Sequence, residues 1–424
     1  MKYLFKKIVI AIIELQAKLV LKKHKPYVVA ITGSVGKTSS KEAVYLVVSS
    51  KHHSRKSQKS FNSEIGVPLT ILGCPTGWSN PFIWLKNIFK GFMVILFTRK
   101  YPKYLVLEVG ADRPGDIKRI CSWLFPNTGI VTAIGETPVH VEFFPSRDEL
   151  ISEKSELIKA LPSDGKAILN ADDPDVTNMR ALAEGRPIFY GFSEEAEIKA
   201  SHYNYVYDKK GNVTGFSFKV NYNGSSVPFM FEGFLGRQHV YAILAGISAG
   251  ISVGMNMVEI QESLKDYSAQ PGRVRLLKGQ NNSVLIDDSY NASPASVEAA
   301  LNELEKINSK GRKIAILGDM LDLGKYTYEE HKKVGEKAFE VCDLVISVGA
   351  RGRTITEEYA SKGKHFSDSA KASREFPLEL AEGDLVLIKG SQGSRMERIT
   401  EVLLENKEEA KDKLVRQEEH WKNN

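Results

Sequence analysis

The sequence predicts an α/β protein of two successive domains. The first is expected to hold a mostly parallel sheet with a small antiparallel meander, and the second to be Rossmann-like. Short apolar runs alternate with polar helical stretches from Tyr27 to about Gly254, which is typical of a parallel sheet covered by helices. Residues 201–232 instead alternate with period two. A second series of apolar runs follows residue 268.

The individual elements follow from these patterns. In the central domain, expected at residues 27–268, apolar runs predict strands at 28–31, 104–109, 128–134 and 166–170. Turn signals at 210–212 and 223–224 divide the meander. Residues 268–272 are typical of a linker. In the C-terminal domain, expected at 269–424, strands are predicted at 283–288, 313–319, 343–349 and 384–390. The charged residues 401–424 predict a solvated helix.

The N-terminal segment, residues 1–26, predicts an amphipathic helix over about 4–22. Its apolar run is interrupted by Glu14, Gln16 and Lys18, so it is too short for a membrane span or a signal peptide. Two interpretations stay open: packing on the body of the protein, or contact with a membrane surface.

The composition is that of a globular protein, with 42% hydrophobic and 26% charged residues among 424. The net charge of +6 suits anionic substrates but is too small to indicate nucleic acid as a partner. The three cysteines are far apart and form no CxxC pair, so the sequence indicates neither a disulfide framework nor a zinc site. A reducing cytoplasm is expected.

A phosphate-binding loop is the most specific motif. TGSVGKT (32–38) follows a buried strand, and its two glycines let backbone N–H groups surround an anion. The next helix is expected to begin at about Lys37, which would reach the phosphates, and the Thr38 hydroxyl can bind Mg²⁺. Glu108, at the end of another predicted strand, is a second candidate Mg²⁺ ligand. The absence of an N-K-x-D motif argues against a GTPase.

Eight stretches, the phosphate loop among them, carry a family resemblance. They are ITGSVGKTSSKE (31–42), NSEIGVPLTIL (62–72), LEVGADRPGDI (107–117), LNADDP (169–174), PGRVRLL (271–277), IDDSYNASPAS (286–296), LGDMLDLG (317–324) and KGSQGSRME (389–397). In this order they resemble Mur ligases, closest to the branch that joins D-alanyl-D-alanine to a UDP-N-acetylmuramoyl tripeptide. The resemblance covers about residues 28–400.

The resemblance implies an ADP-forming ligase of peptidoglycan precursor synthesis, a cytoplasmic monomer with ATP and two Mg²⁺ ions as cofactors. Its substrates would be a nucleotide-sugar peptide and a dipeptide or amino acid. A substrate carboxylate would attack the γ-phosphate of ATP, and an amine would displace phosphate from the resulting acyl phosphate. Such an enzyme mainly positions anions and neutralises their charge.

The resemblance also implies residue roles. Metal ligands would be Thr38, Glu108, His140 and Lys154, with Lys154 carried as a carbamate. Catalytic roles would fall to Lys37, His140, Lys154 and Arg273. Nucleotide contacts would come from Gly33, Ser34, Val35, Gly36, Lys37, Thr38, Ser39, Arg273, Asp288, Tyr290 and Asn291. Substrate contacts would come from Asn62, Glu64, Lys389 and Ser391. The pair Asp287-Asp288 could alternatively cap a helix.

Three departures from the family pattern affect these expectations. The run Gly236-Arg237-Gln238-His239-Val240-Tyr241-Ala242 lacks the two asparagines expected near adenine. Only 32 residues precede Gly33, so the family's N-terminal UDP-binding domain is expected to be missing. Residues 65–107 contain no acidic residue. Within them, 78–104 mixes aromatic and basic residues and would suit a membrane surface or a nucleotide-sugar, or would pack its apolar face into the core.

We therefore expect the N-terminal helix and residues 78–104 to replace the missing domain, with peripheral contact to the inner membrane surface through residues 1–24 and 78–104. Deletion of residues 1–24 would then raise the KM for the acceptor more than the KM for ATP. Two other functions stay open. One is a Mur-like amino-acid or polyglutamate ligase with a different acceptor, and the other is a non-catalytic ATP-binding scaffold of a wall-synthesis complex.

Overall fold

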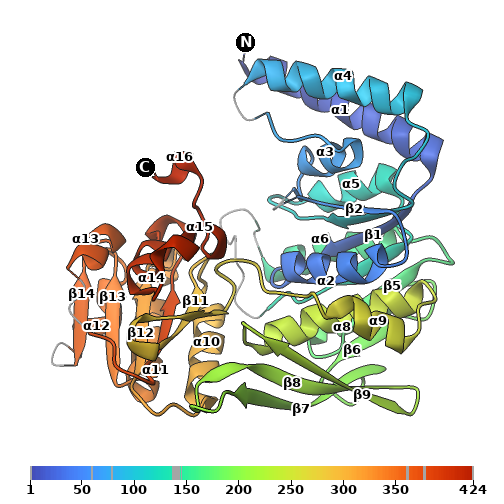
Figure 1. The fold of residues 1–424 in the computed structure, drawn as a ribbon. Helices are drawn as coiled ribbons and strands as arrows, with labels where there is room; N and C mark the ends of the chain where they lie inside the picture. Colours follow the sequence, from blue (N-terminus) through green and yellow to red (C-terminus); the bar gives the residue numbers. More distant parts are fainter. Residues whose placement is uncertain are drawn as a thin grey trace. The chain divides into compact units, whose positions relative to one another are not determined.

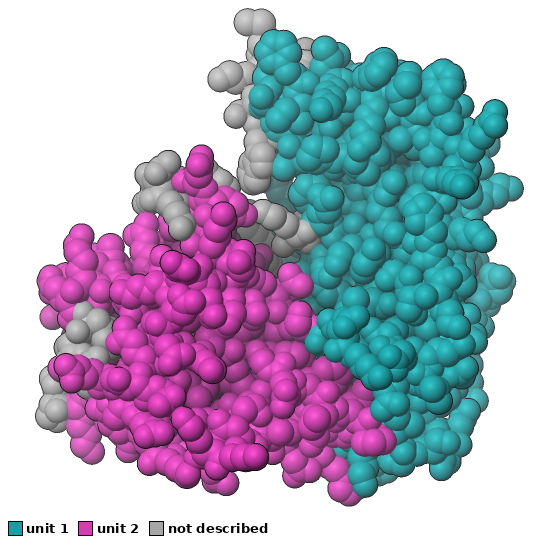
Figure 2. All heavy atoms as spheres, in the orientation of Figure 1, with its two compact units in different colours: residues 1–201, 219–227, 238–267 teal, residues 202–218, 228–237, 268–424 magenta. Residues whose placement is uncertain are grey.

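The structure is a computed structural model that describes residues 2–58, 61–77, 80–135, 144, 146–359, 362–375 and 379–422. The side chains of residues 2–7, 420 and 422 lie outside this description. Two compact units are present (Figure 2). The first comprises residues 1–201, 219–227 and 238–267, and the second comprises residues 202–218, 228–237 and 268–424.

Among the described residues, the strands of the first sheet follow the order β2-β3-β1-β4-β5-β6-β7-β8-β9 (Figure 1). The neighbouring strands from β2 to β7 all pair in parallel. Strands β7 to β9 follow one another through short turns, as the period-two pattern predicts. The strands are β1 Tyr27–Thr32, β2 Ser54–Lys56, β3 Tyr104–Glu108, β4 Thr128–Val131, β5 Lys166–Asn170, β6 Ile188–Gly191, β7 Ile198–Tyr207, β8 Val213–Tyr222 and β9 Ser225–Glu232.

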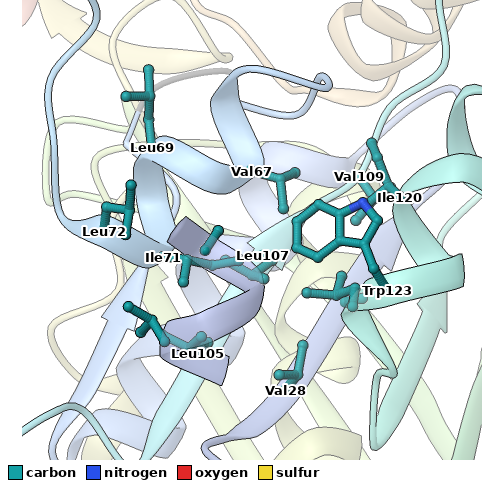
Figure 3. Close-up of a cluster of buried hydrophobic side chains, with 14 of the residues drawn as sticks. Val28, Val67, Leu69, Ile71, Leu72, Leu105, Leu107, Val109, Ile120 and Trp123 are labelled. Carbon is teal, nitrogen blue, oxygen red and sulfur yellow. The ribbon is translucent and has the colours of Figure 1, made fainter. Parts of the chain in front are cut away.

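Helices cover both faces of the parallel part of this sheet. Val28 of β1 and Leu105 and Leu107 of β3 share one core with α1, α3 and α5 (Figure 3). On the other face α2 contacts β1, β3 and α9, and Gly246 of α8 lies against Ala43 of α2. The helices are α1 Lys2–His24, α2 Lys37–Ser49, α3 Gly66–Leu72, α4 Pro81–Phe97, α5 Asp116–Leu124, α6 Arg147–Lys159, α7 Pro174–Asn178, α8 Arg237–Ser252 and α9 Met257–Leu264, with a 3-10 turn at Met179–Leu182.

The second sheet has the order β10-β11-β15-β12-β13-β14 (Figure 1). In this order β10 and β11 pair antiparallel, and the other neighbouring strands pair in parallel. The strands are β10 Arg275–Lys278, β11 Val284–Asp288, β12 Lys313–Gly318, β13 Leu344–Val348, β14 Gly363–Phe366 and β15 Leu385–Lys389. The helices are α10 Pro294–Lys306, α11 Thr327–Val341, α12 Arg353–Glu357, α13 Ser369–Arg374, α14 Glu397–Leu403, α15 Ala410–Lys413 and α16 Glu419–Lys422, with 3-10 turns at Gln280–Asn282, Gly324–Tyr326, Gln392–Ser394 and Lys407–Glu409. The predicted α/β fold class is confirmed.

The prediction of one solvated helix over residues 401–424 is wrong. Residues 401–422 form the end of α14 and several short helical turns, and Leu414 and Arg416 are buried. Leu414 joins the apolar core of the second unit beside Leu403 and Leu404. The few apolar positions that attach this segment to the core are surrounded by charged residues in the sequence, so the charge pattern alone predicted a solvated helix.

The helix predicted for the N-terminal segment is confirmed, since α1 spans Lys2–His24. One of its faces buries Val9, Ile13, Ala17 and Val20 in the core of the first unit. These residues recur at helical spacing, so burial of one apolar face accounts for the packing. The helix thus packs on the body of the protein, while other residues of α1 stay exposed.

Candidate functional site

The phosphate loop connects β1 to α2 and depends on both of its glycines. Gly33 has φ +142° and Gly36 has φ +84°, in the region that favours glycine. A Cβ on Gly33 would lie 2.0 Å from Thr132 Oγ1. Gly36 is the N-cap of α2 and supplies no side-chain cap, which fits an anion at this helix N-terminus.

The two residues that follow β4, Thr132 and Ala133, fix the shape of this loop. The Ser34 N–H donates to the Ala133 carbonyl at 2.6 Å, and the Thr132 hydroxyl donates to the Val35 carbonyl at 2.6 Å. Lys37 Nζ donates to the carbonyls of Gly33 (2.7 Å) and Ser34 (3.2 Å). The Ser34 hydroxyl is buried and has no partner among the described residues. A buried hydroxyl beside a lysine and a helix N-terminus fits a phosphate ligand.

Glu108 joins two other predicted site residues. It ends β3, is 1% exposed, and lies opposite Ile31 in the β1–β3 register. Its Oε2 accepts from Thr38 Oγ1 and its Oε1 accepts from Asn62 Nδ2, both at 3.1 Å. A hydroxyl and a carboxylate are hard oxygen donors, which fits Mg²⁺ that takes its other ligands from phosphate and water. Within the described ranges, no group of three or more His, Cys, Asp or Glu side chains is arranged to hold a metal ion.

Lys154 is buried on α6, only 3% exposed. Burial, together with the nearby charge of Lys37, lowers the pKa of its ammonium to about 7. The neighbouring Glu153 accepts from the N–H groups of Gly115 (2.6 Å) and Ile117 (2.5 Å) and so holds the start of α5. Lys154 therefore differs from an ordinary helical lysine, whose ammonium is exposed to solvent. His140 lies outside the described residues.

Two positions of the first unit that the sequence analysis singled out contact other side chains of the same unit. Glu64 pairs with Arg119 at 2.5 Å, and Arg119 also pairs with Glu14 of α1 at 2.9 Å. On α8, His239 occupies the altered run and is buried, with Nδ1 3.1 Å from the Tyr267 hydroxyl. Tyr267 also hydrogen-bonds the Ser39 side chain. A His–Tyr–Ser contact thus connects α8 to the first turn of α2.

In the second unit, the aspartate pair at the end of β11 is buried. Asp287 accepts from the Gly272 N–H at 3.1 Å and from Thr400 Oγ1 at 3.3 Å. Burial raises the pKa of Asp287 to about 6. Asp288 accepts from Lys389 Nζ at 2.5 Å, and burial raises its pKa although Lys389 opposes this. The alternative of a helix-capping pair is wrong, since Ser293 is the N-cap of α10.

The remaining predicted residues of the second unit surround this pair. The Arg273 guanidinium lies 4.0 Å from the centre of the Tyr290 ring. Lys389 Nζ also donates to the Asn291 carbonyl at 3.0 Å. Ser391 Oγ donates to the Ala292 carbonyl at 3.2 Å and accepts from the Leu321 N–H at 2.9 Å. The structure thus brings Arg273, Asp288, Tyr290, Asn291, Lys389 and Ser391 together.

Sequence reasoning missed one residue that fixes this group. Arg416 donates to the carbonyls of Ser289 (2.5 Å) and Tyr290 (3.3 Å) and pairs with buried Glu397 at 3.0 Å. The only sequence signal was the short apolar run at Leu414 and Val415 in a charged segment. Thr132, which shapes the phosphate loop, likewise gave no separate signal within its apolar strand.

Comparison with known proteins identifies the family. Family models described as "Mur ligase middle domain" and "Mur ligase, glutamate ligase domain" match residues 90–250 and 272–392. The UDP-N-acetylmuramoyl-tripeptide–D-alanyl-D-alanine ligase of Escherichia coli (strain K12) is 30% identical over 382 residues, which are 89% of this chain and 77% of that protein. The chain belongs to the Mur ligase family. Members of this family are ATP-dependent acid–amino-acid ligases, so the predicted enzyme class is confirmed.

Other Mur ligases show a similar relationship. The ligase of the same name from Bacillus subtilis (strain 168) is 28% identical over 397 residues, 92% of this chain and 78% of that protein. Among solved structures, the MurF ligase from Thermotoga maritima in complex with ADP has a TM-score of 0.75 at 24% identity. The match covers 95% of this chain and 84% of that one. This structural likeness supports the fold.

Proposed function

We propose that this Mur ligase joins D-alanyl-D-alanine to a UDP-N-acetylmuramoyl peptide in the cytoplasm, through an acyl phosphate, as a step of peptidoglycan precursor synthesis. The names of the relatives from E. coli and B. subtilis support the choice of substrates. The observation that carries the chemistry is the contact of Thr38 with Glu108 beside the glycine loop. A hydroxyl and a carboxylate side by side next to this loop support a metal that would bind the phosphates of ATP.

The residues of the first unit would divide the work between phosphate and metal. The loop N–H groups, the Ser34 hydroxyl and Lys37 would bind the phosphates of ATP. Thr38 and Glu108 would hold one Mg²⁺, which when bound supplies positive charge to the phosphoryl oxygens. Asn62 donates to Glu108 and fixes the orientation of its carboxylate. Its expected substrate contact would use its remaining hydrogen-bonding capacity.

Lys154 fits the carbamate that we propose for it. With a pKa of about 7, about half of its amine is neutral at neutral pH and able to add to CO₂. The ammonium first loses one proton, and the neutral amine then adds to CO₂, which forms an N–C bond and releases a second proton, so a buried cation becomes an anion. The repulsion from Lys37 then becomes an attraction. A carboxylate at this position could join His140 in holding a second Mg²⁺.

The proposed reaction has two steps. A carboxylate oxygen of the UDP-muramoyl peptide attacks the γ-phosphorus, and ADP leaves. The amine of D-alanyl-D-alanine then attacks the acyl carbon, and phosphate leaves with the bridging oxygen as the amine loses a proton. Lys37 would stabilise the negative charge of the transferred phosphoryl group. In the second unit, Arg273, Asp288, Tyr290 and Asn291 would contact nucleotide, and Lys389 and Ser391 would contact substrate.

Phosphate release from ATP and Mg²⁺ tests this proposal. We expect release only when UDP-N-acetylmuramoyl tripeptide and D-alanyl-D-alanine are both present. Thr38→Val, which removes only the metal-binding hydroxyl, should abolish turnover, while Ser49→Ala at the other end of α2 should not. Release stimulated by glutamate instead of the dipeptide would contradict the proposed amine. No turnover with any pair of substrates would refute the enzymatic proposal and favour the scaffold.

A further inference from the structure

Helix α4 forms an outer layer of the first unit. Asn80 caps it by accepting from the N–H groups of Phe82 and Ile83. It packs on α1, which in turn contacts α3 and α5 (Figure 1). Gln16 Nε2 of α1 donates to the Ile88 carbonyl at 2.8 Å. A Cβ on Gly91 would lie 2.2 Å from Gln16 Oε1, so this glycine permits the close approach of the two helices.

The face of α4 turned away from α1 is apolar and exposed. Phe82 is 79% exposed, Phe89 62% and Phe97 68%. With four others they make up what we call the α4 apolar face: Phe82, Leu85, Phe89, Phe92, Met93, Leu96 and Phe97. Their spacing places them on one side of the helix. The prediction that an apolar face packs into the core therefore fails for these seven residues, although Trp84, Ile88 and Ile95 on the opposite side do pack there.

Basic residues border this face. Lys86 and Lys90 lie one turn apart along its edge, and both are exposed. Arg99 and Lys100 are exposed just beyond the end of α4. Residues 65–107 contain no acidic residue that could neutralise them. Exposed phenylalanines with lysines at their border are typical of a helix that lies in the plane of a membrane interface.

We propose that the α4 apolar face binds the surface of a bilayer that contains anionic phospholipids. The phenylalanine and leucine side chains would enter the acyl boundary, and the lysines would meet the headgroup phosphates. Binding would be peripheral, since within the described ranges no helix is long and apolar enough to cross a bilayer. A two-fold dimer through this face would bring equivalent lysines together without acidic partners from residues 65–107, which disfavours a second copy as the occupant.

Vesicle co-sedimentation of the full chain tests this inference independently of catalysis. The probe is vesicles of about 30 mol% phosphatidylglycerol in phosphatidylcholine, at about 0.1 M NaCl, with pure phosphatidylcholine vesicles for comparison. Leu85→Glu/Phe89→Glu should reduce partitioning to anionic vesicles by about tenfold or more. Met230→Glu/Val258→Glu is the matched control, because it adds the same charges at exposed apolar positions of β9 and α9.

A second pair of variants tests the role of charge. Lys86→Gln/Lys100→Gln should weaken binding to anionic vesicles by about fivefold or more and leave binding to phosphatidylcholine unchanged. Wild-type protein that stays with the supernatant, or equal losses in the control variant, would overturn the proposal. A dimer that Leu85→Glu/Phe89→Glu converts to monomer, without vesicle binding by the wild type, would identify a second copy as the occupant and would also overturn it.

Discussion

Thr38 and Glu108 are 70 positions apart in the chain, yet Thr38 Oγ1 donates to Glu108 Oε2 at 3.1 Å. The parallel register of β1 and β3 produces this contact, because it sets Glu108 opposite Ile31, just before the phosphate loop. Two residues that the sequence offered as separate metal-ligand candidates therefore meet at one edge of the sheet. This arrangement is what a P-loop and a single carboxylate need to share a metal with a nucleotide.

Glu108→Gln should remove metal binding without unfolding the protein. Glutamine keeps the volume and can still accept from Thr38, but it lacks the negative charge that attracts Mg²⁺. We expect kcat for phosphate release to fall by about 100-fold or more, and half-saturation with Mg²⁺ to move to higher concentration. A Mg²⁺ titration of initial rates measures both. Glu64→Gln, at a half-buried carboxylate that pairs with Arg119, should keep the wild-type Mg²⁺ requirement. An unchanged Mg²⁺ titration for Glu108→Gln would show that Glu108 is no ligand.

Lys154→Met should stabilise the fold, most strongly at low pH. The folded state binds the Lys154 proton more weakly than the unfolded chain does, since burial lowers the pKa to about 7. Wild-type stability should therefore rise with pH above about 7, by about 2 to 3 kcal/mol by pH 9, while the variant shows no such rise. Urea unfolding in CO₂-free buffer measures the difference.

Lys159→Met on the same helix is the control for this experiment, because Lys159 is exposed and pairs only at the surface with Glu156. The control should follow the wild-type pH dependence. Parallel stability curves for wild type and Lys154→Met would contradict the lowered pKa. The Lys154→Met variant should also lose phosphate release at every pH, because it can form no carbamate.

Gly33→Ala should destroy nucleotide binding. An alanine Cβ would meet Thr132 Oγ1 at 2.0 Å in addition to adopting an unfavourable φ, so the loop must leave its position on β4. Gly224→Ala has a positive φ with open space around it and should cost only about 1 kcal/mol from backbone strain. Isothermal titration with ATP and Mg²⁺ distinguishes the two variants. ATP affinity of Gly33→Ala equal to that of the control would contradict the role of the loop.

Lys389→Met should destabilise the second unit by about 3 to 5 kcal/mol, because it leaves Asp288 buried without its cation. The loss should grow as pH rises. Without Lys389 the pKa of Asp288 in the folded state rises further above its value in the unfolded chain. The folded state then binds the Asp288 proton more tightly than the unfolded chain does, so stability falls as the proton is lost at higher pH. Thermal unfolding between about pH 5 and pH 8 measures this trend. Asp288→Asn/Lys389→Met should recover most of the loss, and a double variant as unstable as the single one would show that Lys389 acts elsewhere.

Much of the fold could be predicted from sequence because local patterns determined it. The apolar runs that form strands are short and bounded by polar residues, as at β1, β3, β5, β11 and β15. Helix α2 begins at Lys37, directly after the second glycine of the loop, as predicted. The contacts of Thr132 and Arg416 depend on strand order and on the path of the last residues, which local patterns do not contain. The outer position of α4 was hidden for a related reason: apolar residues on both sides of a helix do not indicate which side is buried.

Isotope transfer tests the central claim, formation of an acyl phosphate, most directly. The acceptor peptide is labelled with ¹⁸O in both oxygens of its reacting carboxylate, and the phosphate released with D-alanyl-D-alanine is analysed by mass spectrometry. The proposed reaction predicts one ¹⁸O atom in each phosphate and one in each amide carbonyl, because the bridging oxygen leaves with the phosphate. Unlabelled phosphate, released while both ¹⁸O atoms stay with the peptide, would show that ATP is hydrolysed by water and would contradict the account.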